Sequence, residues 1–222
     1  MADETRARGH EPGLRERKKR QMREEISAVA TRMFIERGFE QVTIVQVAEA
    51  ANVAKMTVTN YFPLKEDLVF DRHDEVVAAL TGVVVARGPG ESVLDAARRY
   101  YREALRREDP TLGQRGVEFA RMVEASPALV ARERQMHDQR ELALAEVLVD
   151  ELAASPEDLR PRIVAAQIVG VVRVLYYEAR RRLRAGANLG ALAGIADAAF
   201  DLLRTDIGDY GVRTGSPGPG TP

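Results

Sequence analysis

The sequence predicts an all-α protein, in which an N-terminal three-helix domain with a helix-turn-helix unit precedes a larger helical domain. Two observations predict this fold class. Apolar residues recur at the spacing of one helix face along most of the chain, and no segment alternates apolar and polar residues as a half-buried strand does. The 222 residues, 45% of them hydrophobic, are enough to fill one large core or two small ones.

The first expected helix ends at Gly38, because glycine readily adopts the left-handed conformation that closes a helix. Its apolar stripe follows the positions i, i+3, i+4, i+7 and i+8: Ile26, Val29, Ala30, Met33 and Phe34. A short second helix is expected after Thr43, which is an N-cap candidate. Its stripe is Ile44, Val47, Ala48 and Ala51. Asn52 ends it, and a third short helix is expected over residues 54–62, before Pro63.

The second domain is expected to begin with a long helix over residues 65–86, which ends before the break Gly88-Pro89-Gly90. Ser126 and Pro127 mark the start of another long helix, as an N-cap followed by proline at the first helical position. The later helices are expected over residues 92–108, 111–124, 127–153, 161–183 and 188–207. The resulting organisation is a flexible arm at 1–14, a helix-turn-helix domain at 15–64, a helical domain at 65–208 and a disordered Gly/Pro-rich tail at 209–222.

Composition excludes several classes of protein. The chain has no cysteine, which rules out disulfides, zinc–thiolate sites and thiol catalysis. No run approaches the roughly 18 apolar residues of a membrane span, and the N-terminus lacks the apolar centre of a signal peptide, so we expect a cytoplasmic protein. The net charge of −1 argues against a chain that is basic throughout, but residues 14–23 hold six basic side chains against one acidic. Alone, such a run is more often a solvated helix face or a flexible tail.

One segment resembles a known family. Residues 43–53 (TIVQVAEAANV), followed by Thr57-Val58, Tyr61-Phe62, Lys65 and Leu68, resemble the N-terminal DNA-binding domain of TetR/AcrR-type transcriptional repressors. The resemblance covers roughly residues 20–68, and the rest of the chain fits the family in helical architecture only. Four residues depart from the family's usual pattern: Asn52, Ala54, Met56 and Thr59.

The resemblance implies that the third helix enters the major groove of DNA with its N-terminus first. Lys55 is then placed to read guanine, and Thr57 and Met56 are placed to contact a base or a thymine methyl group. Other polar residues suit phosphates, and the basic segment suits an accessory arm. The complete set of expected DNA contacts is Arg17, Lys18, Thr43, Lys55, Met56, Thr57, Thr59, Asn60, Tyr61 and Lys65. The alternative is that these side chains are only the solvated face of a short helix.

For the second domain, the resemblance implies that the last two helices of two subunits form a four-helix bundle. The candidate interface stripes are Ile163, Ala166, Val169, Gly170, Val174 and Tyr177, and then Leu192, Ile195, Ala199 and Leu203. Either stripe is alternatively buried within one subunit. A ligand pocket is expected among the middle helices, with six candidate residues that are alternatively plain core: Tyr100, Tyr101, Phe119, Met122, Arg173 and Tyr176.

An enzyme is not expected. His10, His73 and His137 are far apart in sequence, and the neighbours of His73 in DRHD do not share one helix face. No phosphate-binding glycine loop and no nucleophile motif is present. We therefore expect no catalytic residues, no metal site and no cofactor.

These inferences predict a transcriptional repressor that binds a pseudo-palindromic, double-stranded DNA operator as a homodimer. A small-molecule effector is expected to release it, and no membrane partner is expected. The alternative is a helical interaction or adaptor protein that keeps the fold without sequence-specific DNA binding. Retardation of promoter fragments at low salt separates the two, because an adaptor does not retard DNA selectively.

Overall fold

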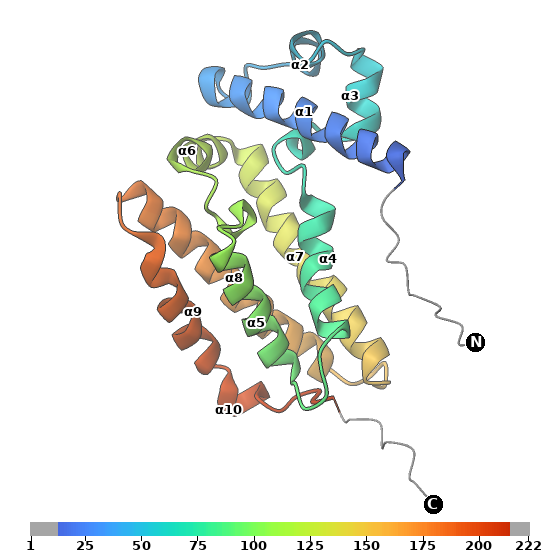
Figure 1. Cartoon of the computed structure of the whole chain (residues 1–222), viewed down its shortest axis with the longest axis vertical. Coiled ribbons are helices and arrows are strands. Elements are labelled where there is room, and N and C mark those ends of the chain that lie inside the picture. Colours follow the sequence, from blue (N-terminus) through green and yellow to red (C-terminus); the bar gives the residue numbers. More distant parts are fainter. Residues whose placement is uncertain (1–12, 214–222) are drawn as a thin grey trace, which may run out of the picture. The chain divides into compact units, whose positions relative to one another are not determined.

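The computed structural model describes residues 13–213, and this range is all-α, as the sequence predicts (Figure 1). The chain divides into two compact units, with the boundary between Asp71 and Arg72. Residues 1–12 of the expected arm and 214–222 of the expected tail lie outside the described residues. The last two residues of the expected arm are described: Gly13 is the N-cap of the first helix, and Leu14 is its first residue.

The first unit contains helices α1 (Leu14–Arg37), α2 (Ile44–Ala50) and α3 (Lys55–Tyr61), and a 3₁₀ turn η1 (Lys65–Leu68). The helix ends follow the sequence signals. Gly38 has a φ of 89°, Thr43 forms a capping box with Gln46, and Asn52 has a φ of 53° in the left-handed region. The unit's small core is formed by apolar side chains that are fully buried: Ile26, Phe34, Val47, Val58, Phe62 and Leu68.

The prediction of one long helix over residues 65–86 is wrong. The chain forms the turn η1, leaves helical geometry, and begins α4 (His73–Val85) only after Arg72. Residues 67–70 are all buried, and four consecutive buried side chains cannot share one helix face, because each step turns the direction by about 100°. The carbonyls freed from helical bonding are taken up by α1: Ser27 Oγ donates to Leu68 O at 2.9 Å, and Arg23 Nε donates to Asp71 O at 2.9 Å.

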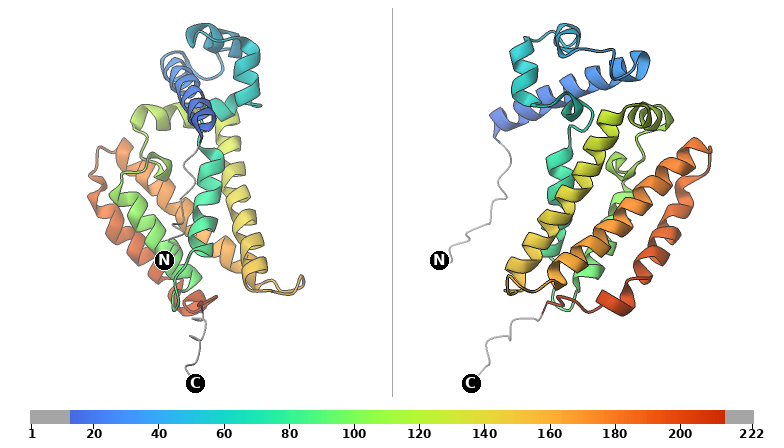
Figure 2. Two further views of the ribbon diagram at one scale, coloured as in Figure 1. Left: turned by 45° about the vertical axis from the view of Figure 1, so that its right-hand side comes forward. Right: turned by 180° about the vertical axis from the view of Figure 1, so that it is seen from behind.

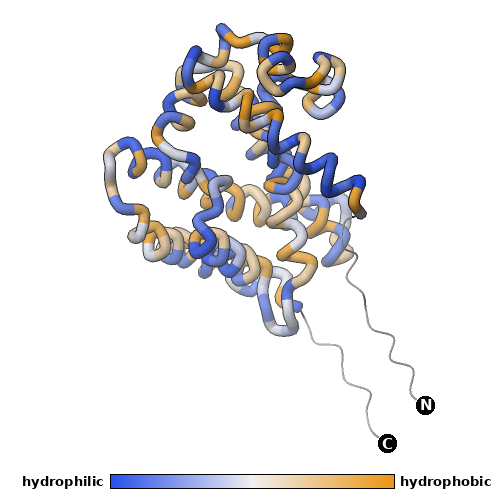
Figure 3. Tube along the Cα trace, turned by 45° about the horizontal axis from the view of Figure 1, so that its top comes forward, coloured by the Kyte–Doolittle hydropathy of each residue, from blue (hydrophilic) through white to orange (hydrophobic). Residues whose placement is uncertain are grey.

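The second unit is a bundle of helices whose long members lie side by side (Figures 1 and 2). Its elements are α4 (His73–Val85), α5 (Val93–Arg106), η2 (Pro110–Leu112), α6 (Val117–Ala125), α7 (Pro127–Glu151), α8 (Arg160–Arg184), η3 (Leu189–Ala191), α9 (Leu192–Asp201) and α10 (Arg204–Ile207). Helix α7 packs against α4 and α8, and α9 packs against α5 and α8. Hydrophobic residues recur along each helix and supply a common core, which includes Leu80, Tyr101, Leu144, Ile168 and Phe200 (Figure 3).

Residues 209–213, predicted to belong to a disordered tail, are attached to the second unit. The N–H of Val93 donates to Tyr210 O at 3.2 Å, and the N–H of Gly90 donates to Arg213 O at 2.8 Å. Arg87 Nε donates to Gly211 O at 2.9 Å. The Gly88-Pro89-Gly90 break is therefore a loop within this unit. No helix in residues 13–213 combines the length and the apolar composition needed to cross a bilayer.

Candidate nucleic-acid interface

Helix α3 is held by its apolar side and presents polar residues on the other. Val58 is fully buried, and Phe62, which follows the helix, is also buried. Lys55, Met56 and Asn60 are exposed, whereas Thr57, Thr59 and Tyr61 are half-buried at the edge of this surface. The first turn of α3 therefore carries the most accessible side chains, which is the part of a recognition helix that meets base edges.

Two side chains at the start of α3 are open to solvent, Lys55 and Met56, although the Met56 sulfur lies 3.8 Å from the Thr59 hydroxyl. The Lys55 ammonium makes no hydrogen bond or ion pair with any residue in the described range. Met56 is 69% exposed, although a large apolar side chain gains free energy from burial. Thr59, in contrast, turns back onto its own helix, where Oγ donates to Met56 O at 3.1 Å. Lys55 and Met56 are thus available to a partner in the way that a base-reading residue must be.

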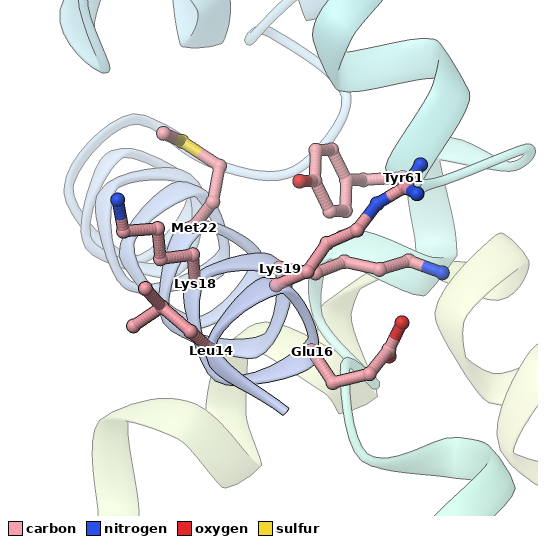
Figure 4. Close-up of a pocket in the computed structure, with 7 residues that line it drawn as sticks. Leu14, Glu16, Lys18, Lys19, Met22 and Tyr61 are labelled. Carbon is pink, nitrogen blue, oxygen red and sulfur yellow. The ribbon is translucent and has the colours of Figure 1, made fainter. Parts of the chain in front are cut away.

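The groove between α1 and α3 joins basic side chains to Tyr61 (Figure 4). It has a volume of about 760 Å³, and its lining residues are Leu14, Arg15, Glu16, Lys18, Lys19, Met22 and Tyr61. Figure 4 shows Tyr61 projecting from α3 toward the Met22 and Lys19 side chains of α1. A groove with three cations and a phenol hydroxyl at its edge suits a DNA phosphate.

The structure separates the two predicted contacts of the basic segment. Lys18 lines the groove with Tyr61, whereas Arg17 is exposed on α1 but does not line it. Arg15 and Lys19 also line the groove; they belong to the basic segment expected to act as an accessory arm, although neither was singled out as a contact. Helical spacing supplies the signal that finds them, because residues 15, 18, 19 and 22 fall on one face at i, i+3, i+4 and i+7.

Thr43 and Lys65 have structural partners. The Thr43 hydroxyl accepts from the N–H of Gln46 at 3.3 Å and so caps α2. Lys65 Nζ donates to Phe39 O and lies 4.1 Å from the centre of the Phe39 ring. Burial lowers the pKa of the Lys65 ammonium, with Glu40 and Glu66 opposing that shift. Lys65 therefore ties η1 to the α1–α2 connection, and its predicted phosphate contact stays a prediction that this geometry does not favour.

We expect Lys65→Ala to lower the free energy of unfolding by about 1–3 kcal/mol, because it removes a charged hydrogen bond and a cation–π contact. Urea denaturation of the protein measures the change. Lys55→Ala is the matched control and is expected to change stability by less than about 0.5 kcal/mol, since its side chain is exposed. Equal effects of the two substitutions would contradict a structural role for Lys65.

The six predicted pocket residues do not form one set. Tyr101 belongs to the core, where its ring centre lies 6.0 Å from that of Phe200. Arg173 is exposed on α8, and its positive charge acts on His137. Phe119 and Met122 are both buried on α6.

Tyr176 and Tyr100 lie with buried polar groups of α7. The Tyr176 hydroxyl donates to Glu133 Oε1 at 2.7 Å, and its ring centre lies 5.5 Å from that of His137. Tyr100 and Tyr176 both interact electrostatically with Arg140. Glu133 and Arg140 carry no sequence signal that marks them as interior residues, because charged side chains on an amphipathic helix are usually solvated.

The turn after η2 packs closely on this part of α8. Gly113 has a φ of 87°, and a Cβ atom added there would lie 2.6 Å from Tyr176 O. Both the backbone conformation and the close approach therefore require glycine.

His137 is 5% exposed, and neither ring nitrogen has a hydrogen-bond partner among residues 13–213. Burial lowers its pKa to about 4, and the positive charges of Arg140 and Arg173 add to the shift. The two tyrosine rings packed on it, Tyr176 and Tyr177, are uncharged at neutral pH.

The unfolded chain binds a proton at His137 near pH 6.5, before the folded chain does, so the stability contributed by neutral His137 is present above that pH and is lost toward pH 4. We expect the native protein to lose about 3 kcal/mol more than His137→Gln between pH 7 and pH 4. Urea unfolding at a series of pH values gives this difference. Parallel pH profiles for the two proteins would contradict a neutral, buried His137.

The residues of the predicted dimer stripes divide between exposed and buried positions. On α8, Ile163, Val174 and Tyr177 are exposed, and Ala166 and Gly170 are partly exposed beside them. Val169 is buried in the core, because it lies about 100° around the helix from the centre of this row. On α9, Leu192 is buried, and three other predicted residues pack on the same core: Ile195, Ala199 and Leu203. The exposed apolar residue after α9 is instead Leu202, at 80%.

No group of three or more His, Cys, Asp or Glu side chains in the described part of the chain is arranged to hold a metal ion.

Comparisons with known proteins match both units. The profile described as "Bacterial regulatory proteins, tetR family" matches residues 26–71, and that of the "MftR C-terminal domain" matches residues 88–207. The HTH-type transcriptional regulator TcmR of Streptomyces glaucescens is 31% identical over 209 residues, which are 91% of this chain and 92% of that protein.

Two solved structures share the fold. A TetR-family regulator from Streptomyces coelicolor A3 aligns with a TM-score of 0.51 and 24% identity, over 89% of this chain and 99% of its own. The transcriptional regulator FadR from Bacillus subtilis, in complex with stearoyl-CoA, aligns with a TM-score of 0.50 and 15% identity, over 81% of this chain and 96% of its own.

Proposed function

We propose that this chain, which belongs to the tetR family of bacterial regulatory proteins, represses transcription by binding a pseudo-palindromic operator as a homodimer. Membership makes it a DNA-binding transcriptional regulator rather than an enzyme. What we propose beyond family membership is that the protein represses transcription, that it acts as a dimer and that an effector releases it from DNA. We further propose that it acts in the cytoplasm, at the nucleoid.

The observation that carries the proposal is the accessible first turn of α3. The Lys55 ammonium projects from it with no hydrogen bond or ion pair to residues 13–213, Met56 is exposed, and Val58 fixes the opposite side of the helix in the core. A lysine suits guanine in the major groove, and a methionine side chain suits a thymine methyl group. The α1 groove with Lys18, Lys19 and Tyr61 supplies the phosphate contacts that set the register.

We propose that the dimer forms through the open faces of α8 and α9, which pack side by side in one subunit. The small residues Ala166 and Gly170 allow a close approach of helices. The surrounding apolar residues, Ile163, Val174 and Leu202, are exposed in the single chain, which is unfavourable unless a partner covers them. A stable interface of this kind buries on the order of 1,000 Å² or more.

Val174→Arg is expected to convert the dimer to a monomer, because it places a charge at the centre of the proposed interface. Light scattering after gel filtration measures the mass. Leu142→Arg on α7 is the matched control, since Leu142 is 63% exposed and Val174 is 64% exposed. A native protein that is monomeric, or a Val174→Arg protein that stays dimeric, would contradict the proposed interface.

Footprinting on DNA selected from a random library tests the operator. We expect two protected half-sites related by a dyad, about 34–36 Å or a small multiple of that apart, because two recognition helices of one dimer meet successive turns of the same face. A single asymmetric half-site at saturation would reject the dimeric reading of DNA. Equal retardation of selected and random fragments would reject the regulator and favour the adaptor.

The second unit is proposed to bind the effector. The stearoyl-CoA complex of Bacillus subtilis FadR supports this only as an example of a ligand-bound protein with a similar fold. Release requires that the effector binds the operator-free dimer more tightly than the operator-bound one, and the coupling is reciprocal. Its chemistry is the subject of the next inference.

A further inference from the structure

Three arginines in the second unit are buried, and they differ in how their charge is balanced. Arg180 is 3% exposed and bonds to Glu133 Oε1 at 2.7 Å and Glu124 Oε1 at 3.1 Å. Arg87 is 3% exposed, and its guanidinium meets Glu151 at 3.2 Å and the carbonyls of Val84 and Gly211. Both therefore follow the rule that a buried charge is paired.

Arg140 is the exception. It is 9% exposed on α7, and none of its nitrogens has an ion pair or hydrogen bond with another residue of the described range. The groups that act electrostatically on it are the Tyr100 and Tyr176 hydroxyls, both uncharged at neutral pH. Burial lowers the pKa of the guanidinium, but arginine stays protonated near neutrality. The fold thus retains one largely buried positive charge without a negative partner among residues 13–213, which is unfavourable.

The surroundings of Arg140 offer polar atoms that are also unused. His137 lies one turn earlier on the same face of α7, with two unpartnered nitrogens, and packs against the Tyr176 ring. The Tyr100 hydroxyl, on α5, also acts on the Arg140 guanidinium. The neutral imidazole supplies one donor and one acceptor, and the phenol supplies a donor. Helices α5 and α7 therefore direct polar groups without hydrogen-bond partners in the described range to one place, beside the Tyr176 ring of α8, which is the arrangement of polar groups that a ligand site needs.

We propose that Arg140 anchors the effector through a single negative charge, so that the effector is an organic monoanion such as a carboxylate on an otherwise uncharged body. This rests on the proposed regulatory function. A monoanion balances the one uncompensated cation, and a carboxylate matches the two parallel donors of a guanidinium. A dianion such as a phosphate monoester would need a second cation inside the cluster, whereas Arg180 is already balanced by Glu133 and Arg173 is exposed to solvent.

The test is thermal unfolding of the full-length protein with acetate, benzoate and 2-naphthoate, each compared with its amide at matched ionic strength. Each amide has nearly the shape of its acid without the charge. We expect at least one carboxylate to raise the Tm of the native protein and its amide to have no such effect. The absence of any carboxylate-specific rise across the three pairs overturns the proposal.

Substitutions test whether Arg140 is responsible for the carboxylate-specific rise in Tm. Arg140→Met is expected to abolish the carboxylate-specific rise, Arg140→Lys to retain part of it, and the exposed Arg134→Met on the same helix to retain all of it. Without any probe, Arg140→Met is expected to melt no lower than the native protein, because it removes an unpaired buried charge. A rise that survives in Arg140→Met, or a variant that unfolds at markedly lower temperature or fails to fold, overturns the proposal.

Failure of this inference is distinguishable from failure of the proposed function. Carboxylate binding through Arg140 without selective DNA binding rejects the regulator alone. Selective DNA binding without carboxylate-specific stabilisation rejects the anchor alone. Where both hold, the carboxylate that raises the Tm is expected to release selected DNA from the native protein but not from Arg140→Met, and release from both would overturn the role of Arg140.

Discussion

Arg180→Met is expected to lower the free energy of unfolding by about 3–5 kcal/mol, the largest effect of any single substitution proposed for this chain. The guanidinium lies against Glu133, which is itself 4% exposed, and donates to Ala120 O at 3.0 Å. Methionine fills much of the same volume but leaves the Glu133 carboxylate buried without its cationic partner, beside the Tyr176 and Tyr177 hydroxyls. The loss comes mainly from that uncompensated charge.

Urea denaturation measures this effect, and the chain offers a close control. Arg181 is the next residue on α8, is exposed, and pairs only with Glu178 within the helix. Arg181→Met is expected to cost less than about 1 kcal/mol, as surface pairs do. Adding Glu133→Gln to Arg180→Met is expected to recover part of the lost stability, because neither charge of the Arg180–Glu133 pair then remains. If Arg180→Met and Arg181→Met were equally stable, the buried ion pair would not support the fold.

Lys55→Ala is expected to weaken binding to selected DNA by about 1–3 kcal/mol per half-site and to relax the preference at one base pair. The reason is that Lys55 is exposed on the first turn of α3 and has no intramolecular partner in the described part of the chain. Titration by fluorescence anisotropy on selected DNA and on variants of it measures both effects. The affinity for random DNA is expected to change far less.

Lys18→Ala provides the contrast, because Lys18 lines the α1 groove beside Tyr61 rather than the tip of α3. It is expected to weaken binding to all sequences similarly and to make the salt dependence shallower by about one unit of slope. The assignment of Lys55 to base reading fails if the two variants lose the same affinity on selected and random DNA.

The helix ends of the first unit were predictable, because each is set by a local signal. Thr43 caps its own helix, and Gly38 and Asn52 take up backbone angles that their residue types tolerate. The end of α3 was also predictable, since proline at residue 63 cannot continue it. The interruption after Leu68 was not, because the bonds that replace helical ones come from Arg23 and Ser27, more than 40 residues earlier.

The candidate site shows the same division. Lys55 and Met56 follow from the position of α3 alone, whereas Lys65 has the composition of a phosphate contact and is used inside the unit. On α8, spacing finds an apolar row but does not say which of two rows faces the core, so Val169 was wrongly grouped with Val174. Arg140 escaped notice because sequence carries no sign that a particular arginine lacks a partner.

The contacts of Arg23 and Ser27 have a consequence for how the first unit opens. Both belong to α1, and between them they hold the carbonyls of Tyr61, Leu68 and Asp71. Fraying of the segment after α3 therefore requires these hydrogen bonds to break together. Unfolding of α1 would likewise remove Arg23 and Ser27 as donors to these three carbonyls. Amide hydrogens of residues 65–71 and of the middle of α1 are accordingly expected to exchange with solvent in one cooperative step, with a common free energy of opening.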